Sequence, residues 1–140
     1  MLQSLEMRLP VTNTYCTGRA SDSRDLINSL LRQSGKENLP DCIFCSSSMT
    51  AHGVLRALWE NQIPVPETVK IVAVGNGLDE DDLCMIPSLS VVQIQMEKVA
   101  AECMKLLLSL ISDGTSEPIT RVIPVSYVPR ESCGPLCRAF

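Results

Sequence analysis

Three consecutive serines, Ser46, Ser47 and Ser48, are the residues of this sequence best suited to bind a small molecule. They follow the short apolar run of residues 41–45, which has the length and composition of a buried strand. A helical pattern begins directly after them, so their hydroxyls lie beside the free backbone amides of a helix N-terminus. An N-cap accounts for one serine, and two hydroxyls remain for a ligand. We expect Phe44, just before the serines, to add stacking or apolar contact.

Asn76 is a further candidate for the same site, because it follows the next apolar run, residues 69–74. Its amide can donate and accept hydrogen bonds. It stands between Gly75 and Gly77, but no helix with a third glycine follows, and no Walker-type loop occurs. Glycine and asparagine tolerate positive φ, so this segment is expected to be a turn rather than a phosphate-binding loop.

Catalytic chemistry has little support in the sequence. His52 is the only histidine, and it lies within the helical pattern that follows the serines. No serine or cysteine stands at a recognisable catalytic spacing from it. We therefore expect a partly exposed helix residue, no catalytic residue and no enzyme.

The cysteines and acidic residues do not form a convincing metal site. Cys42 and Cys45 have redox or zinc spacing, but they lie in a predicted strand, where residues three apart point to opposite faces. Cys133 and Cys137 could add ligands, but their spacing is weak for zinc. The acidic residues 79–82 lack the spacing of an EF-hand and are expected to be a solvated loop. We expect no metal and no cofactor.

Strands alternate with helices along the chain. The predicted strands cover residues 10–16, 41–45, 69–74, 90–94 and 121–128. The predicted helices run from a cap at Ser21-Asp22-Ser23 to Gly35, from the serines to Asn61-Gln62, and over residues 97–111. This alternation predicts an α/β fold, a parallel sheet flanked by helices, with the second strand between the first and third. Right-handed crossovers place the carboxyl ends of the strands at one edge, where ligands of such sheets bind.

Composition fits one domain that is soluble and cytoplasmic. The chain has 140 residues, a net charge of −4 and a pI of about 4.9, which argues against a surface that binds nucleic acid. Its seven cysteines are an odd number and lie mostly in apolar runs, as expected for reduced thiols in the cytosol. No run is long enough to span a membrane, and residues 1–9 lack the pattern of a signal peptide.

Five segments, in the right order, resemble the effector-binding domain of LacI/GalR-type regulators, which has the type I periplasmic-binding-protein fold. They are residues 39–45 (LPDCIFC), 49–58 (MTAHGVLRAL), 63–69 (IPVPETV), 87–92 (PSLSVV) and 124–133 (PVSYVPRESC). The resemblance implies a bacterial transcriptional regulator. In such a protein an effector, sugar or nucleobase-like, binds between two lobes, and DNA is bound only through a domain absent from this chain.

The resemblance also has consequences for the site. The family commonly has Asn-Asp or Gly-Asp where Ser47 and Ser48 stand, and Gly-Phe-Asp-Asp where residues 73–76 stand. Those aspartates often contact the effector, so their loss would remove charged acceptors from the pocket. An arginine near the start of the first helix commonly contacts effector as well, which places Arg24 and Asp25 among the candidates.

The resemblance divides the chain into four parts. Residues 9–89 match the core of one lobe, residues 90–113 match the crossover and helix of the otherwise missing lobe, residues 120–133 match the closing strand, and residues 134–140 form a tail. We therefore expect a partial effector-binding domain, about half of the two-lobed unit.

We also expect a homodimer. In the family, subunits pair partly through the helix matching residues 49–60, which points to His52, Leu55 and Trp59. The helix of residues 97–111 carries an apolar stripe that includes Leu106 and Leu110. Leaving this stripe in water would forgo several kcal/mol. It should dock on its own lobe or, as we favour, against the same helix of a second copy.

Two other function classes remain open. The first is a ligand-binding lobe fused to a different signalling output. The second is a small flavodoxin-like enzyme, which the absence of a phosphate-binding loop disfavours.

Overall fold

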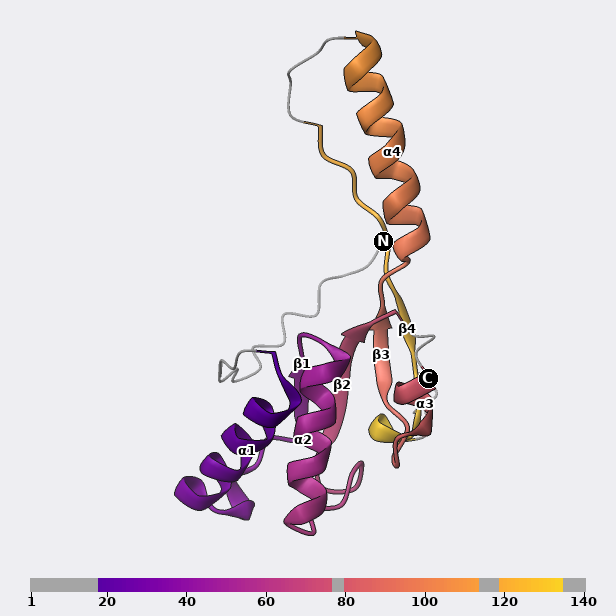
Figure 1. Ribbon diagram of the computed structural model, residues 1–140. Coiled ribbons are helices and arrows are strands. Elements are labelled where there is room, and N and C mark those ends of the chain that lie inside the picture. The colour runs from indigo at the N-terminus through magenta and orange to yellow at the C-terminus, as the bar shows by residue number, and fades with distance from the viewer. Residues whose placement is uncertain (1–17, 77–79, 114–118, 135–140) are drawn as a thin grey trace, which may run out of the picture.

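The computed structural model describes residues 18–76, 80–113 and 119–134 (Figure 1). The helices are α1 (Ala20–Ser34), α2 (Ser48–Glu60), α3 (Glu80–Cys84) and α4 (Met96–Asp113), with the short 3-10 helices η1 (Lys36–Asn38) and η2 (Glu131–Cys133). The strands are β1 (Cys42–Cys45), β2 (Lys70–Gly75), β3 (Ser90–Gln93) and β4 (Ser126–Val128).

The four strands form one sheet in the order β1-β2-β3-β4. β1 pairs with β2, and β2 with β3, in parallel, whereas β4 is antiparallel to β3. The predicted α/β class and the parallel pairing of residues 41–45 with 69–74 are confirmed. The first predicted strand, residues 10–16, lies outside the described residues. Its predicted position in the sheet, next to the strand of residues 41–45, is therefore not tested.

The last strand is shorter than predicted. β4 starts at Ser126, whereas the apolar alternation suggested residues 121–128. Ser126 pairs with Gln93, which is the last residue of β3. Residues 119–125 therefore have no part of β3 beside them, and alternation alone does not make a strand without a neighbour to bond.

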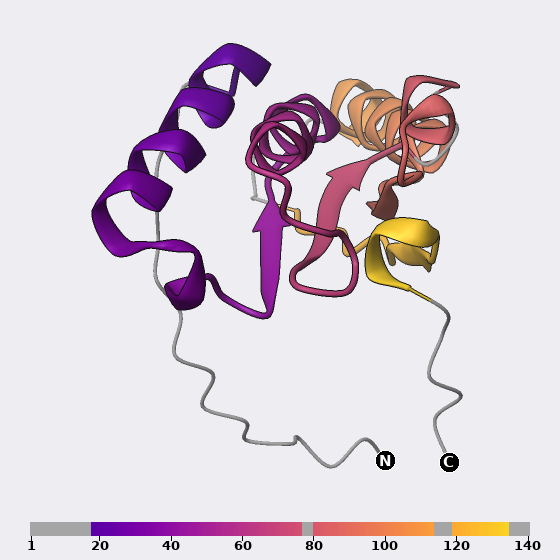
Figure 2. The ribbon, with the colours of Figure 1, turned by 90° about the horizontal axis from the view of Figure 1, so that it is seen from below.

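The core lies between α2 and the sheet. α2 covers one face of β1 and β2, and α1 packs beside it (Figures 1 and 2). The predicted apolar stripe of α2 is confirmed, because its members, Ala51, Val54, Leu55 and Leu58, are all buried. They meet the inward side chains Ile71, Ala73 and Val91 of the sheet.

The start of α1 differs from the prediction. The N-cap is Arg19, not the segment Ser21-Asp22-Ser23. Ser23 is buried one turn inside the helix, where its hydroxyl donates to the backbone oxygens of Arg19 (3.2 Å) and Ala20 (3.1 Å). Those carbonyls satisfy a hydroxyl that has no access to water. The predicted end of α1 at Gly35 is confirmed. The Gly35 amide donates to the backbone oxygen of Leu31, and Gly35 has a positive φ of 79°.

α4 stands beyond the end of β3, away from α1 and α2 (Figure 1). Of the two expected arrangements, docking on its own lobe is therefore not the one observed. Leu106 is partly covered and Leu110 is 39% exposed, while Leu107 and Ile111 are more exposed still. The crossover after Gln93 leads the chain out of the sheet, so the helix has no sheet surface to pack on.

The closing segment is held to the sheet by a buried serine. The Ser132 hydroxyl donates to the backbone oxygen of Ile71 (2.7 Å) and accepts from the amide of Ser90 (2.8 Å). Glu131 accepts from the amide and the hydroxyl of Ser88 (2.8 and 3.0 Å), and these bonds lower the pKa of its carboxyl. The segment that resembles the family's Arg-Glu-Ser ending thus fastens β4 to β2 and β3.

Gly53 gives a test of how closely α1 and α2 pack. A Cβ at this position would lie 2.0 Å from the backbone oxygen of Ala20 and 2.1 Å from the Ser23 hydroxyl. Gly53→Ala should destabilise the fold by about 1–3 kcal/mol, although alanine favours helices, because the contact atoms include rigid backbone. Urea unfolding measures this, with Gln33→Ala on the exposed side of α1 as control. An unchanged midpoint would contradict the packing.

Candidate functional site

Ser47 provides the N-cap of α2. Its Oγ accepts from the Thr50 amide at 3.2 Å and is hydrogen-bonded to the Thr50 hydroxyl at 3.0 Å. Its extended backbone, φ −155° and ψ 157°, is the usual conformation of a capping residue. The expectation that one serine serves as a cap is confirmed. Ser46 is exposed and Ser48 is partly exposed, and both follow directly after the carboxyl end of β1.

Ser48 is bonded to a buried carboxylate from α3. Its hydroxyl donates to Asp82 Oδ2 at 2.8 Å, and Asp82 is 0% exposed. His52, one turn further along α2, lies 3.0 Å from Asp82 Oδ1 through Nε2. A carboxylate accepts hydrogen bonds, so the imidazole carries its proton on Nε2. Both oxygens of Asp82 are therefore bonded to side chains of α2.

The prediction of a solvated acidic loop is wrong for Asp82. Glu80 and Asp81 are exposed, but residues 80–84 form α3, which turns Asp82 inward. An ionised carboxylate is stable in such a place only when partners replace its water. Ser48 and His52 are those partners.

The arrangement of these three residues is unlike a hydrolase triad. In a triad, histidine lies between serine and carboxylate and takes the proton of the serine. Here Asp82 lies between Ser48 and His52, and the Ser48 proton is directed at the carboxylate. His52 is a partly exposed helix residue, as predicted, with 19% of its side chain exposed.

Most of the predicted ligand residues gather at one edge of the sheet. Ser46 and Ser48 follow β1, and Asn76, which is exposed, follows the parallel neighbour β2. Phe44 is 64% exposed and lies near the end of β1, on the face opposite the buried Cys45. We call these four residues, Phe44, Ser46, Ser48 and Asn76, the carboxyl edge.

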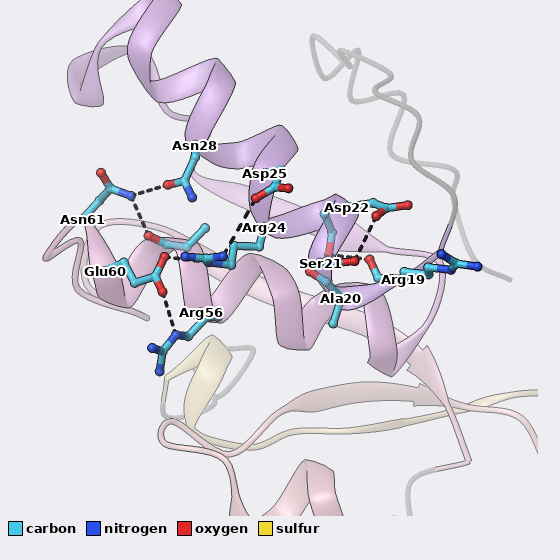
Figure 3. Close-up of polar contacts among 12 residues, drawn as sticks. Arg19, Ala20, Ser21, Asp22, Arg24, Asp25, Asn28, Arg56, Glu60 and Asn61 are labelled. Atoms are coloured by element: carbon cyan, nitrogen blue, oxygen red, sulfur yellow. Dashed lines mark hydrogen bonds and ion pairs between the residues drawn. The ribbon is translucent and has the colours of Figure 1, made fainter.

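Arg24 and Asp25 are not brought to the carboxyl edge. Arg24 Nε donates to Glu60 at 2.8 Å, and Asp25 lies 4.0 Å from the same guanidinium (Figure 3). Glu60 ends α2, about 18 Å along the helix from Ser48 at 1.5 Å per residue. Hydrogen bonds from Arg24 and then Arg56 hold the pKa of the Glu60 carboxyl below its usual value. The same bond raises the pKa of Arg24.

The two cysteines of β1 point to opposite faces, as predicted. Cys42 is exposed and Cys45 is buried. Burial by its surroundings raises the pKa of the Cys42 thiol, and the nearby Cys133 raises it further. A thiol with a raised pKa is a poor nucleophile and metal ligand at neutral pH. Within residues 18–76, 80–113 and 119–134, no group of three or more His, Cys, Asp or Glu could hold a metal ion.

The predicted dimer residues occupy two different environments. Trp59 is 67% exposed, with the guanidinium of Arg56 4.7 Å from its ring centroid. His52 lies on the same outward side of α2. Leu55 is only 4% exposed and belongs to the core, where a second chain does not reach it. Of the three predicted dimer residues on α2, His52 and Trp59 are therefore still candidates for an interface, and Leu55 is not.

The sequence of residues 3–133 matches the family model of the periplasmic binding protein-like domain. The chain belongs to this family. Among the described helices, none is long and apolar enough to cross a membrane.

Curated relatives of the chain are transcriptional regulators. The HTH-type transcriptional repressor MelR of Bacillus subtilis is 33% identical over 97 residues, which are 69% of this chain and 27% of that protein. The HTH-type transcriptional regulator RegA of Clostridium acetobutylicum is 28% identical over 115 residues, 82% of this chain and 33% of that protein. The chain thus spans about a third of the length of these relatives.

Solved structures share the fold. A LacI family transcriptional regulator from Arthrobacter sp. FB24, in complex with lactose, superposes with a TM-score of 0.69 at 24% identity, over 82% of this chain and 41% of that one. With the family match and the relatives, this confirms the predicted resemblance to the effector-binding domain of LacI/GalR-type regulators.

Asp82 is the residue that sequence reasoning missed. The family resemblance implied that the aspartate commonly found at the position of Ser48 is lost. A carboxylate is nevertheless present next to this position, because Asp82 of α3 accepts a hydrogen bond from Ser48. Residues 79–84 contain no glycine, proline, serine or asparagine, which favours a helix over a loop. The sequence thus contained a signal for the helix α3. It contained none for the hydrogen bond between Ser48 and Asp82, which are 34 residues apart.

Asp82→Ala should destabilise the fold by about 2–4 kcal/mol, because it leaves the Ser48 and His52 side chains without their acceptor and opens a cavity. Asp81→Ala removes an exposed acid from the same helix and should change stability by no more than about 0.5 kcal/mol. Urea unfolding of both variants makes the comparison. Equal stabilities would mean that Asp82 is not buried and bonded as described.

Proposed function

We propose that this chain is the effector-sensing part of a bacterial transcriptional regulator of LacI type. A small molecule binds between this lobe and a second lobe, and binding shifts the state of a DNA-binding domain outside the chain. The observation that carries the proposal is the carboxyl edge, where Phe44, Ser46, Ser48 and Asn76 stand at the ends of the neighbouring strands β1 and β2, in a chain that matches the periplasmic binding protein-like family over residues 3–133. A regulator that acts on bacterial DNA works in the cytoplasm.

The effector that fits best is a sugar. The hydroxyls and the amide at the ends of β1 and β2, together with the exposed ring of Phe44 on β1, are polar and apolar groups of the kinds that bind the two faces of a sugar ring. The regulator from Arthrobacter with the same fold is a complex with lactose. A nucleobase-like effector is the second candidate, because Phe44 offers a stacking surface.

The proposed output is a population shift and not a chemical reaction. An effector that binds the closed pair of lobes more tightly than the open pair changes their equilibrium by that difference in affinity. The placement of Asp82 between Ser48 and His52 supports a binding role, since it keeps the imidazole from the Ser48 hydroxyl and so does not form the serine–histidine–carboxylate arrangement of a hydrolase.

The isolated chain should bind sugars only weakly, because one lobe leaves much of a ligand in water. Isothermal titration with lactose and a panel of sugars, purines and amino acids should give no dissociation constant below millimolar. A longer protein that carries both lobes should be stabilised by its effector in a thermal-shift screen of the same panel. A micromolar ligand of the isolated chain would contradict the two-lobe site, and a longer protein that no ligand stabilises would contradict the sensor.

We further propose that the chain forms a homodimer through the outward side of α2, with Trp59 at its centre. His52 is a poor probe, because a charge there would disturb Asp82. Trp59→Glu should weaken a dimer about tenfold or more, since buried tryptophans dominate interfaces. Sedimentation velocity measures this, with Gln33→Glu on α1 as control.

The apolar stripe of α4 is the alternative contact between two copies. Leu110→Lys should weaken the dimer if a second α4 covers Leu106 and Leu110, and it should have no effect if α2 forms the contact. A wild-type chain that stays monomeric at micromolar concentration, or a dimer that neither variant weakens, would contradict self-association through these faces.

A further inference from the structure

The hydrogen bond between Ser48 and Asp82 fixes the direction in which Ser48 can bind a ligand. A serine hydroxyl has one proton and two lone pairs. The proton of Ser48 is donated to Asp82 Oδ2 at 2.8 Å. Asp82 is fully buried and cannot reach a ligand itself, whereas Ser48 is partly exposed at the carboxyl edge. The edge therefore presents the lone pairs of Ser48, with a carboxylate directly behind them.

We infer that Asp82 is a specificity-determining residue that acts through Ser48, so that the effector presents a hydrogen-bond donor, an amine or a hydroxyl, and not a carboxylate or phosphate, to this position. An anionic group would meet an oxygen that has no proton to give. The anionic group would also lie about 6 Å from the buried carboxylate of Asp82, because two successive hydrogen bonds, through the Ser48 hydroxyl, would separate them. This inference rests on the proposed function and narrows the chemistry of the effector.

Local packing keeps the proton of the Ser48 hydroxyl directed at Asp82. His52 bonds the second oxygen of Asp82, so the carboxylate cannot turn away from Ser48 without losing a partner. Gly75, at the end of β2, lies on the other side, and because it has no Cβ the Ser48 hydroxyl packs against its backbone, 2.6 Å from where a Cβ would stand. Ser48 therefore has little room for another rotamer.

The charged side chains beside Asp82 on α3 have the same sign as Asp82. Glu80 and Asp81 on α3 are both acidic and exposed. The nearest cation on α2, Arg56, is bonded to Glu60 and stacked on Trp59. Within the described part of the chain, His52 is the only basic side chain that bonds to Asp82.

The test compares three sugars that differ in charge: glucosamine, glucose and glucuronate. Backbone amide shifts of Ser46, Ser48 and Asn76 are followed by NMR while each sugar is titrated into the full chain to millimolar concentrations. Wild-type chain should prefer glucosamine over glucuronate. Asp82→Asn should reduce that preference on the order of tenfold, the effect of removing a unit charge about 6 Å away in a site open to water.

Asp81→Asn is the matched control, because it removes the same charge from the neighbouring exposed residue. It should leave the preference nearly unchanged. An equal effect of both variants would overturn the inference, since the general field of the acidic chain would then be responsible. An unchanged preference in Asp82→Asn would overturn it as well, while leaving the proposed function intact.

Ser48→Ala is the second variant if Asp82→Asn fails to fold. It should reduce the preference for glucosamine over glucuronate, because the ammonium group loses an acceptor while the carboxylate group loses no favourable contact. An equal loss for all three sugars would overturn the inference. No response at the three amides to any sugar, in wild type or variant, would overturn this inference, while the thermal-shift screen of the two-lobed protein decides the proposed function separately.

Discussion

The two hydrogen bonds that α2 donates to Asp82 are the constraint on which the site depends. A buried carboxylate costs several kcal/mol unless its oxygens are paired, so Ser48 and His52 stabilise α3 in this position. Conversely, Ser48 is held in one orientation only because α3 is in place. α3 and the start of α2 are therefore held together, although 34 residues separate Ser48 from Asp82.

Close packing gives these polar contacts their geometry. Gly53 lets α1 lie against α2, and Gly75 leaves room for Ser48 at the end of β2. Both positions exclude a Cβ because oxygen atoms lie too near. The hydrogen bonds at the carboxyl edge are therefore formed on a rigid support, which is the usual condition for a binding site that discriminates between similar ligands.

The sequence pattern predicted those features of the fold that depend on residues close together in the chain. The stripe of α2, its cap at Ser47 and the parallel strands β1 and β2 follow from periodicity and turn residues, and all were predictable. Asp82 and Arg24 were not, because their partners are remote in sequence: Asp82 is drawn inward by α2, and Arg24 is drawn to Glu60 at the far end of that helix. A run of acids looks solvated until the tertiary partner of one of them is known.

The position of α4 connects the site to the rest of the protein. β1, β2 and β3 run in the same direction, so their carboxyl ends share one edge, and α4 continues from β3 beyond that edge. Its leucines are about half exposed, and burying the rest of each would contribute about 1 kcal/mol. Whatever body covers them, a second lobe or a second copy, lies beyond the end of β3, on the side of the sheet at which the carboxyl edge stands. A ligand at the carboxyl edge can then contact both bodies, and its binding energy depends on how they are arranged.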